Sequence, residues 1–220
     1  MNFDPAFALS ILPRILSTFS TTFLITIVGC LGSALLGFLW EILRRSSLAG
    51  RYGMRFLIDF IRSTPLLVQI YFLYFVLPEY GVTLPALAIG VMALSIYYSG
   101  YLAEVFKAGI DSIPAGQFEA ARALGLSRLQ LVLLVVAPQM LRNIAAPMGN
   151  YFVSLLKATP YLAIIAVPEM LSIALEVASD TFRYTEPMVV VGLVFLSLAL
   201  CFSALVKAIE ARLRLSPKAA

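Results

Sequence analysis

The sequence predicts an all-α membrane protein whose 220 residues, 1–220, form one transmembrane domain with five spanning helices and the amino terminus outside the cytoplasm. Its composition is 61% hydrophobic and only 13% charged, whereas soluble domains carry about 25% charged residues. The mean hydropathy is +0.94, and the apolar residues gather in long runs. This composition therefore argues against a water-soluble single domain.

Three uncharged runs are long enough to cross a bilayer unaided, since a spanning helix needs about 20 mostly apolar residues. They are Ile15–Trp40, Tyr80–Ala103 and Pro187–Val206. They predict spans over approximately 15–42, 83–107 and 187–209. Within the first, Gly29, Ser33 and Gly37 recur every four residues, a pattern that lets helices approach closely.

Two further spans contain charges. Residues 56–78 hold Asp59 and Arg62, which lie three apart on one helix face and so could pair or reach the interface. Residues 129–156 hold only Arg142. The apolar stretch from Ala158 to Leu175 contains Pro160 and Pro168, which predict a broken or re-entrant segment between spans four and five.

The basic residues predict the orientation, because cytoplasmic loops carry the excess of Lys and Arg. Five spans would place eleven of the sixteen basic residues on one side: Arg44, Arg45, Arg51, Arg55, Lys107, Arg122, Arg128, Lys207, Arg212, Arg214 and Lys218. The other side would receive Arg14 and Arg183. A sixth full span would move the basic carboxyl tail outside, which argues against it.

Several function classes are disfavoured by residues that the chain lacks. It contains no histidine, and its two cysteines, Cys30 and Cys201, lie in uncharged stretches. It has no glycine-rich phosphate loop of the Gly-x-x-x-x-Gly-Lys-Ser/Thr type. We therefore expect no catalytic residue, metal site or bound cofactor in this chain. A membrane-embedded enzyme is disfavoured, whereas a secondary transporter or channel driven by an ion gradient stays open.

The loop over residues 110–128 carries helix signals in a polar setting. Ser112 could cap a helix, Pro114 suits a first turn, and Gly125 suits a left-handed stop. These signals predict a short helix from Pro114 to Leu124 on the cytosolic side. Its small alanines and the carboxylate of Glu119 suit docking against another protein.

Here the chain resembles the transmembrane permease subunits of ABC importers that work with a substrate-binding protein. Their loop motif is matched by Glu119-Ala120-Ala121, by Gly125, and by Val135-Val136-Ala137-Pro138, in which Val135 replaces Ile and Ala137 replaces Leu. The resemblance implies that this loop helix couples the permease to a cytosolic ATPase. The coupling residues would be Gly116, Gln117, Glu119, Ala120, Ala121 and Gly125.

Three further blocks resemble permeases of the polar amino-acid uptake group and extend the similarity from about Leu16 to Leu213. They are Arg62 to Gln69, Tyr101 to Ile110, and Lys157-Ala158-Thr159-Pro160, where Ala158 departs from the acidic or polar residue often found in that group. A polar amino acid or similar small zwitterion is the implied substrate. Ectoine-type permeases for compatible solutes are close relatives and form the alternative.

The resemblance also implies the partners and the location. They are a cytosolic ATPase subunit dimer that holds ATP and Mg, a second permease subunit of the same or a homologous chain, and an extracytoplasmic substrate-binding protein. That binding protein would dock near Glu79 and residues 180–186. The chain would be a multi-pass protein of the bacterial inner membrane in contact with lipid, with no role for nucleic acid.

A substrate pathway can be sketched from intramembrane polar residues. Tyr97, Tyr101 and Glu104 share one helix face, and charged groups inside a membrane face protein or water. Glu169 lies in the broken segment, flanked by Lys157 and Thr159. For Glu104 the alternative is an ion pair with Lys107 or Arg128.

Overall fold

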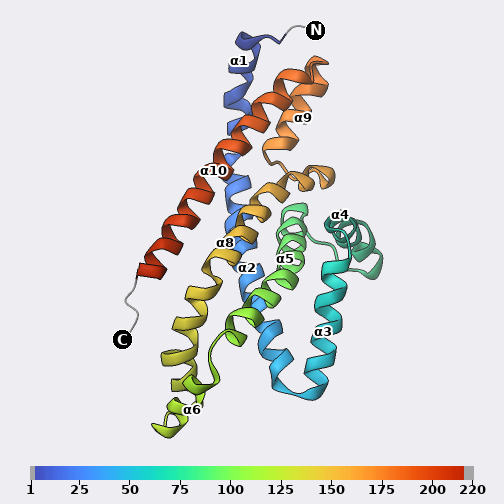
Figure 1. The fold of residues 1–220 in the computed structure, drawn as a ribbon. Coiled ribbons are helices and arrows are strands. Elements are labelled where there is room, and N and C mark those ends of the chain that lie inside the picture. The colour runs from blue at the N-terminus through green and yellow to red at the C-terminus, as the bar shows by residue number, and fades with distance from the viewer. Residues whose placement is uncertain (1–2, 216–220) are drawn as a thin grey trace.

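The structure is a computed structural model that describes residues 3–215, with side chains from 3 to 212. Every regular element in this part of the chain is a helix (Figure 1). Within residues 3–215, four helices are long and apolar enough to cross a membrane, or five if one bent pair is counted as a single span. Lys218 and the side chain of Arg214, both expected in the basic tail, lie outside the described residues.

The first expected span, 15–42, corresponds to α2 (Phe19–Ser46), and a separate helix, α1 (Pro5–Leu16), precedes it. The α1 helix begins after Asp4, whose Oδ1 accepts the backbone N–H groups of Ala6 and Phe7 at 3.0 and 3.1 Å. A turn at Ser17 and Thr18 separates the two helices. The uncharged run starting at residue 15 continues through this turn, so hydropathy alone did not predict it.

The span expected over 56–78 falls on a bent pair of helical segments rather than on one continuous helix. Helix α3 (Leu48–Ser63) is followed by α4 (Leu66–Tyr71), η1 (Phe72–Val76) and η2 (Leu77–Tyr80), with a bend of 101° between the two parts. Pro65 lacks a backbone N–H and holds the preceding residue extended, and Thr64 has φ −97° and ψ 135°. Asp59 pairs with Arg55 at 3.8 Å and not with Arg62.

The next expected spans are present but longer. Span 83–107 is α5 (Ala86–Asp111). Span 129–156 lies within one stretch from Arg128 to Ile165, made of α7 (Arg128–Gln130), η3 (Leu131–Val136), α8 (Ala137–Ala158) and η4 (Thr159–Ile165). Span 187–209 is α10 (Thr185–Leu215).

The broken segment is confirmed. After η4 the chain turns at Ala166, which has φ 55°, and α9 (Met170–Thr181) begins beyond Pro168. Glu169 caps α9, since its side chain accepts the N–H of Ser172 at 2.7 Å. The short helix α6 (Ala115–Ala123) lies in the loop between α5 and α7.

Helices α2 and α5 pack against each other along most of their length. Gly37 of α2 brings the two backbones close together, because a Cβ there would lie 2.9 Å from the Ser99 carbonyl oxygen and 3.0 Å from the Ala103 nitrogen. Ser33 is fully buried in the same stripe, and a Cβ on Gly29 would meet Leu155 of α8 at 3.3 Å. The expected small-residue packing face is confirmed.

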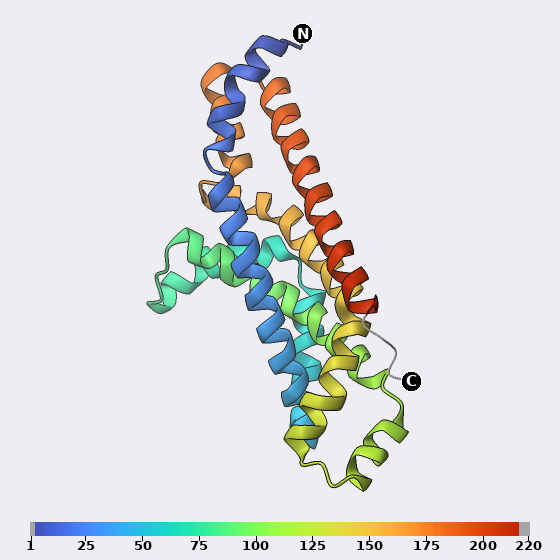
Figure 2. The ribbon, with the colours of Figure 1, turned by 90° about the vertical axis from the view of Figure 1, so that its left-hand side faces the viewer.

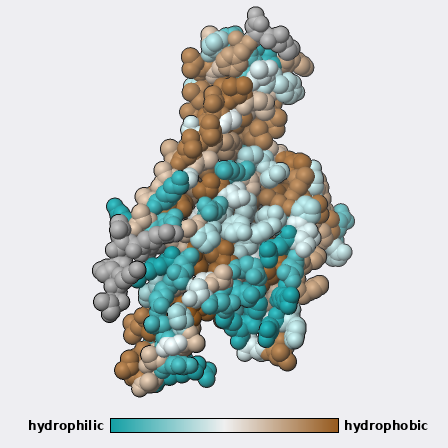
Figure 3. Space-filling model, in the orientation of Figure 1, coloured by the Kyte–Doolittle hydropathy of each residue, from teal (hydrophilic) through white to brown (hydrophobic). Residues whose placement is uncertain are grey.

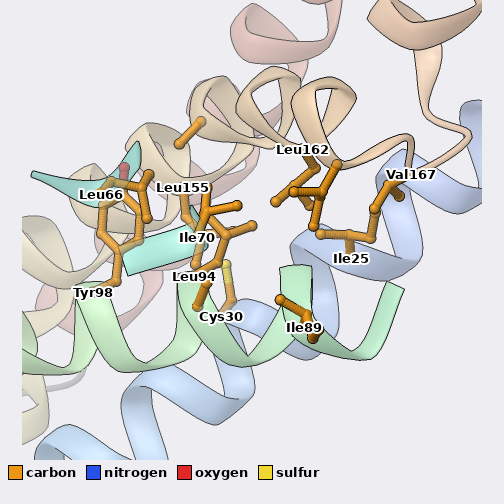
Figure 4. Packing of buried hydrophobic residues seen from close by; sticks show 13 residues of the cluster. Ile25, Cys30, Leu66, Ile70, Ile89, Leu94, Tyr98, Leu155, Leu162 and Val167 are labelled. Atoms are coloured by element: carbon orange, nitrogen blue, oxygen red, sulfur yellow. The ribbon is translucent and has the colours of Figure 1, made fainter. Parts of the chain in front are cut away.

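A cluster of buried apolar side chains joins α2 and α5 to the two broken segments (Figure 4). Ile25 and Cys30 come from α2, and Ile89 and Leu94 come from α5. From α4 come Leu66 and Ile70, and from α8 and η4 come Leu155 and Leu162. The broken segments are thus held by the same core as the long helices.

The two ends of the molecule differ. Helices α1 and α9 and the start of α10 lie at the end that carries the amino terminus, where Arg14 contacts Glu176 and Asp180 at 2.8 and 3.2 Å (Figures 1 and 2). Arg183 donates to Glu186 at 2.5 Å, and this hydrogen bond raises the pKa of the Arg183 guanidinium. The α2–α3 turn and α6 lie at the opposite end.

The substitution Gly37→Ala should force α2 and α5 apart, since the atoms it meets are backbone atoms that cannot rotate away. Overpacking of this kind costs about 1–3 kcal/mol, so the thermal unfolding midpoint of the purified protein should fall. Gly53→Ala is the matched control, because a Cβ there has nothing within 4 Å. An equal midpoint for both variants would contradict this packing.

Candidate functional site

Three cavities follow one another along a face of the bundle, and we name them by their place relative to the α6 end. The upper cavity, of about 510 Å³, is lined by residues of α4, α5 and α8 with their flanks: Pro65, Leu66, Leu67, Tyr97, Tyr98, Ser154, Lys157, Ala158 and Tyr161. The middle cavity, of about 270 Å³, is lined by Arg62, Tyr101, Glu104, Val105, Ala108, Gly109, Ser112, Asn143, Ile144, Pro147 and Tyr151.

The lower cavity is the largest, at about 840 Å³, and lies between the α2–α3 hairpin and α5. Its lining is almost entirely charged: Glu41, Arg44, Arg45, Ser47, Leu48, Arg51, Arg55, Asp59, Arg62, Glu104, Lys107 and Asp111. Hydrophilic side chains gather over α3 and α5 on the face shown in Figure 3. Arg62 and Glu104 line both the middle and the lower cavity, so the two adjoin.

Two tyrosines connect the upper and middle cavities. The hydroxyls of Tyr97 and Tyr101 share a hydrogen bond of 3.2 Å, and the Tyr101 hydroxyl donates to the backbone carbonyl of Arg62 at 3.4 Å. The Arg62 guanidinium carbon lies 5.3 Å from the centre of the Tyr101 ring. The structure therefore brings together Tyr97, Tyr101 and Glu104, as the helical spacing predicted, and adds Arg62.

Glu104 is paired, but with a residue that the sequence did not suggest. Its Oε1 accepts from Nη1 of Arg44 at 2.5 Å, so an ion pair with Lys107 or Arg128 is wrong. Arg44 also donates through Nε to Glu41 at 2.6 Å. Glu41 is only 1% exposed and accepts a further bond of 2.5 Å from Arg45, which in turn reaches Asp111 at 2.6 Å.

This charged network links α2 to α5 beneath their close approach at Gly37. Buried ion pairs form only where partners offset the cost of desolvation, and each carboxylate here has an arginine. Above it, the Trp40 indole N–H donates to Ser99 at 2.9 Å. Because Arg44 and Glu104 are 60 positions apart, no local sequence signal could predict their contact.

The other expected pathway residues are separated by the structure. Lys157 is exposed and lines the upper cavity. Thr159 is fully buried, and its hydroxyl donates to the Leu156 carbonyl at 2.9 Å. Glu169 is also fully buried and lines none of the three cavities, and its Oε2 has no hydrogen-bond partner among the described residues.

The short helix expected over Pro114–Leu124 is present as α6, one residue shorter at each end. Gly125 has φ 72°, which confirms its left-handed stop. Ser112 does not cap α6, because its hydroxyl donates to Gly109 and accepts from Asn143, both at 2.8 Å. Pro114 comes directly before the first turn.

The exposed surface of α6 contains Gly116, Gln117, Glu119 and Ala120, whereas Ala121 is 3% exposed and faces the protein. Phe118 packs against the cluster that includes Val136 and Met140, so α6 rests on the segment leading into α8. Within residues 3–212 no group of histidine, cysteine or acidic side chains could hold a metal ion.

Comparisons with known proteins identify relatives over nearly the whole chain. Residues 33–215 match the family described as binding-protein-dependent transport system inner membrane component. A probable amino-acid ABC transporter permease protein of Sinorhizobium fredii is 38% identical, covering 96% of this chain and 92% of that protein. The glutamine transport system permease protein GlnP of Escherichia coli is 29% identical, covering 98% and 100%.

The fold has a close counterpart among solved structures. A crystal structure described as an amino acid ABC transporter with histidines has a TM-score of 0.88 and 32% identity, covering 96% of this chain and 100% of the other. An inward-facing methionine ABC transporter, at a TM-score of 0.66 and 16% identity, shares the fold.

The substitution Glu41→Ala should destabilise the protein, because it leaves Arg44, whose side chain is 10% exposed, with one partner fewer in a buried setting. Removing one partner of a buried pair costs about 3–5 kcal/mol in the free energy of unfolding. Asp59→Ala is the control, since its pair with Arg55 is exposed and 3.8 Å long, and such pairs contribute about 0–1 kcal/mol. Unfolding of the purified variants in denaturing detergent measures both, and equal losses would contradict the network.

Proposed function

The chain belongs to the family of binding-protein-dependent transport system inner membrane components, and from this premise we propose that it is the permease subunit of an ATP-driven importer for a polar amino acid or similar small zwitterion. The observation that carries the proposal is the row of three cavities, the lowest of which has a largely charged lining and lies toward the end of the bundle that carries α6. Its relatives support the choice of substrate, since two are described as amino-acid or glutamine permeases.

In this proposal α6 is the coupling helix and faces the cytosol, seated on a separate ATPase subunit dimer that holds ATP and Mg. Gly116, Gln117, Glu119 and Ala120 would form the contact, since they are exposed. Ala121 would instead pack α6 against the rest of the permease, because its side chain is buried. The basic α2–α3 turn lies at the same end, which agrees with a cytoplasmic location.

The substrate would pass along the three cavities. Lys157 suits the carboxylate of a zwitterion, Tyr97 and Tyr101 would line the path beside it, and Glu104 would shape the lower part through its pair with Arg44. Thr159 and Glu169 would fix the break between η4 and α9 that forms the outer wall. A second permease of the same or similar sequence would close the path on the open face.

The opposite end of the molecule would face the outside and receive the substrate-binding protein. It offers the turn between α9 and α10 with Arg183, flanked by Asp180 near the end of α9 and Glu186 at the start of α10. This arrangement gives five spans, if α3 and the segment after it count as one, in a bacterial inner membrane. The names of the relatives favour an amino acid over a compatible solute.

The proposal is tested by purifying the chain with the ATPase that accompanies it and reconstituting both in liposomes with the binding protein. Uptake of an amino acid that requires ATP and the binding protein is the expected result. Uptake by this chain alone, insensitive to ATP, would instead indicate a secondary transporter.

The substitution Gly125→Asp should leave the protein folded and inserted but uncouple uptake from ATP hydrolysis. No atom lies within 4 Å of a Cβ at this position, so the new carboxylate would project toward the ATPase rather than into the permease. Gly81→Asp is the matched control, because Gly81 has the same left-handed backbone, with φ 80°, and equally open space.

Substrate-stimulated ATPase activity and uptake should both fall at least about tenfold in the Gly125 variant, the loss expected when about 1.4 kcal/mol of interaction is removed. Both should stay near normal in the Gly81 variant. Normal coupling with aspartate at position 125 would refute the placement of α6 against the ATPase.

A further inference from the structure

We infer that the three cavities select for carboxylates and against cations, so that the importer carries neutral or acidic amino acids and excludes those with cationic side chains. This inference rests on the proposed function, because it assumes that the cavities are the path of the substrate. It assigns a substrate class that the names of the relatives leave open.

The first observation is the imbalance of charge along the path. The cavity linings contain seven cationic side chains and four acidic ones. The acidic residues are Glu41, Asp59, Glu104 and Asp111, and all of them lie in the middle or lower cavity. No carboxylate among the described residues lines the upper cavity, where Lys157 is the charged group.

The second observation is that the four carboxylates are already paired. Glu41 accepts from Arg44 and Arg45, and Glu104 accepts from Arg44 at 2.5 Å. Asp111 accepts from Arg45 at 2.6 Å. Asp59 faces Arg55 at 3.8 Å. Each of these acids thus already has an arginine beside it, which weakens its attraction for an incoming ammonium or guanidinium group; Asp59, in an exposed pair, is the least affected.

The third observation is that cations remain without a carboxylate at every level of the path. Within residues 3–212, Lys157 has none in the upper cavity, and Arg62 has none where the middle and lower cavities join. Lys107 and Arg51 are likewise unpaired with any carboxylate in the lower cavity. A substrate would therefore meet at least one cation without a carboxylate partner in each of the three cavities.

Aromatic rings could in principle receive a cation, since the face of a tyrosine attracts positive charge. The ring that stands at the junction of the cavities is Tyr101, and the Arg62 guanidinium already lies 5.3 Å from its centre. Its hydroxyl is engaged with Tyr97 and with the Arg62 carbonyl. Other rings also line the upper or middle cavity, those of Tyr97, Tyr98, Tyr151 and Tyr161. A ring face at an exposed site, however, attracts a cation only weakly.

An excess of one sign of charge in a cleft raises the local concentration of ions of the opposite sign, and here the cationic side chains outnumber the acidic ones by seven to four. A zwitterionic amino acid has no net charge and can turn its carboxylate toward Lys157 or Arg62. A glutamate side chain adds a second favourable group, whereas a lysine side chain adds a repelled one. Selection by this field acts in addition to any selection by the binding protein.

The test separates selection by the cavities from selection by the binding protein, because it measures amino-acid binding to the purified permease–ATPase complex without the binding protein. Radiolabelled L-glutamate, L-glutamine and L-lysine are similar in length and differ in charge. We expect glutamate or glutamine to bind at least tenfold more tightly than lysine. In the Arg62→Glu variant, and separately in Lys157→Glu, the ratio should shift toward lysine by at least tenfold.

Lys207→Glu is the control, since it reverses a charge on α10 outside the three cavities and should leave the ratio unchanged. An unaltered thermal unfolding midpoint shows that each variant is folded. Lysine binding equal to or tighter than that of the other two, no binding of any of them, or ratios unmoved by both reversals in folded protein, would overturn the inference. Absence of ATP-driven uptake of every amino acid would instead defeat the proposed function.

Discussion

The close contact of α2 with α5 is the constraint on which the rest of the structure depends. Glycine at position 37 lets the two backbones approach, and the network of Glu41, Arg44 and Glu104 links the same helices below. Small residues permit such packing inside a membrane, where no hydrophobic force between helices exists to drive it. One side of α5 is thereby fixed, and its other side is free to line the cavities.

The connections of α6 explain how a short loop helix can act on this unit. Only three residues separate the end of α5 at Asp111 from the start of α6 at Ala115. Ile113 between them is buried, and Phe118 packs on the cluster that leads into α8. Since α5 and α8 both line the middle cavity, a displacement of α6 would reach two walls of the path at once.

Local sequence signals predicted most of the helices, whereas contacts between distant residues determined their bends and side-chain partners. Uncharged runs predicted α2, α5 and α10, and the turn chemistry of Pro114 and Gly125 predicted α6. The bend after Ser63 was missed, because hydropathy counts residues and does not register that Pro65 interrupts the helix. The partner of Glu104 was missed because Arg44 lies on another helix, 60 positions away.

The pathway residues likewise divide into those that local sequence signals predicted and those that only the fold reveals. Tyr97, Tyr101 and Glu104 were predicted from periodicity on one helix, whereas Arg62 and the cationic lower cavity required three helices to be placed together. Glu169 carried a strong signal as a buried acid, yet it caps α9 away from the cavities. A charged residue in a membrane segment therefore indicates that a desolvation cost must be offset, and only the fold shows which contacts offset it.

The most direct test of the account is a photo-crosslink from α6 to the ATPase. A photoreactive amino acid would replace the exposed Ala120, and a second chain would carry it at Thr83, an exposed residue in the turn before α5. The account predicts a covalent product with the ATPase from position 120 and none from position 83. A crosslink from position 83 with none from position 120 would contradict it, because α6 would then lie on the wrong side of the membrane.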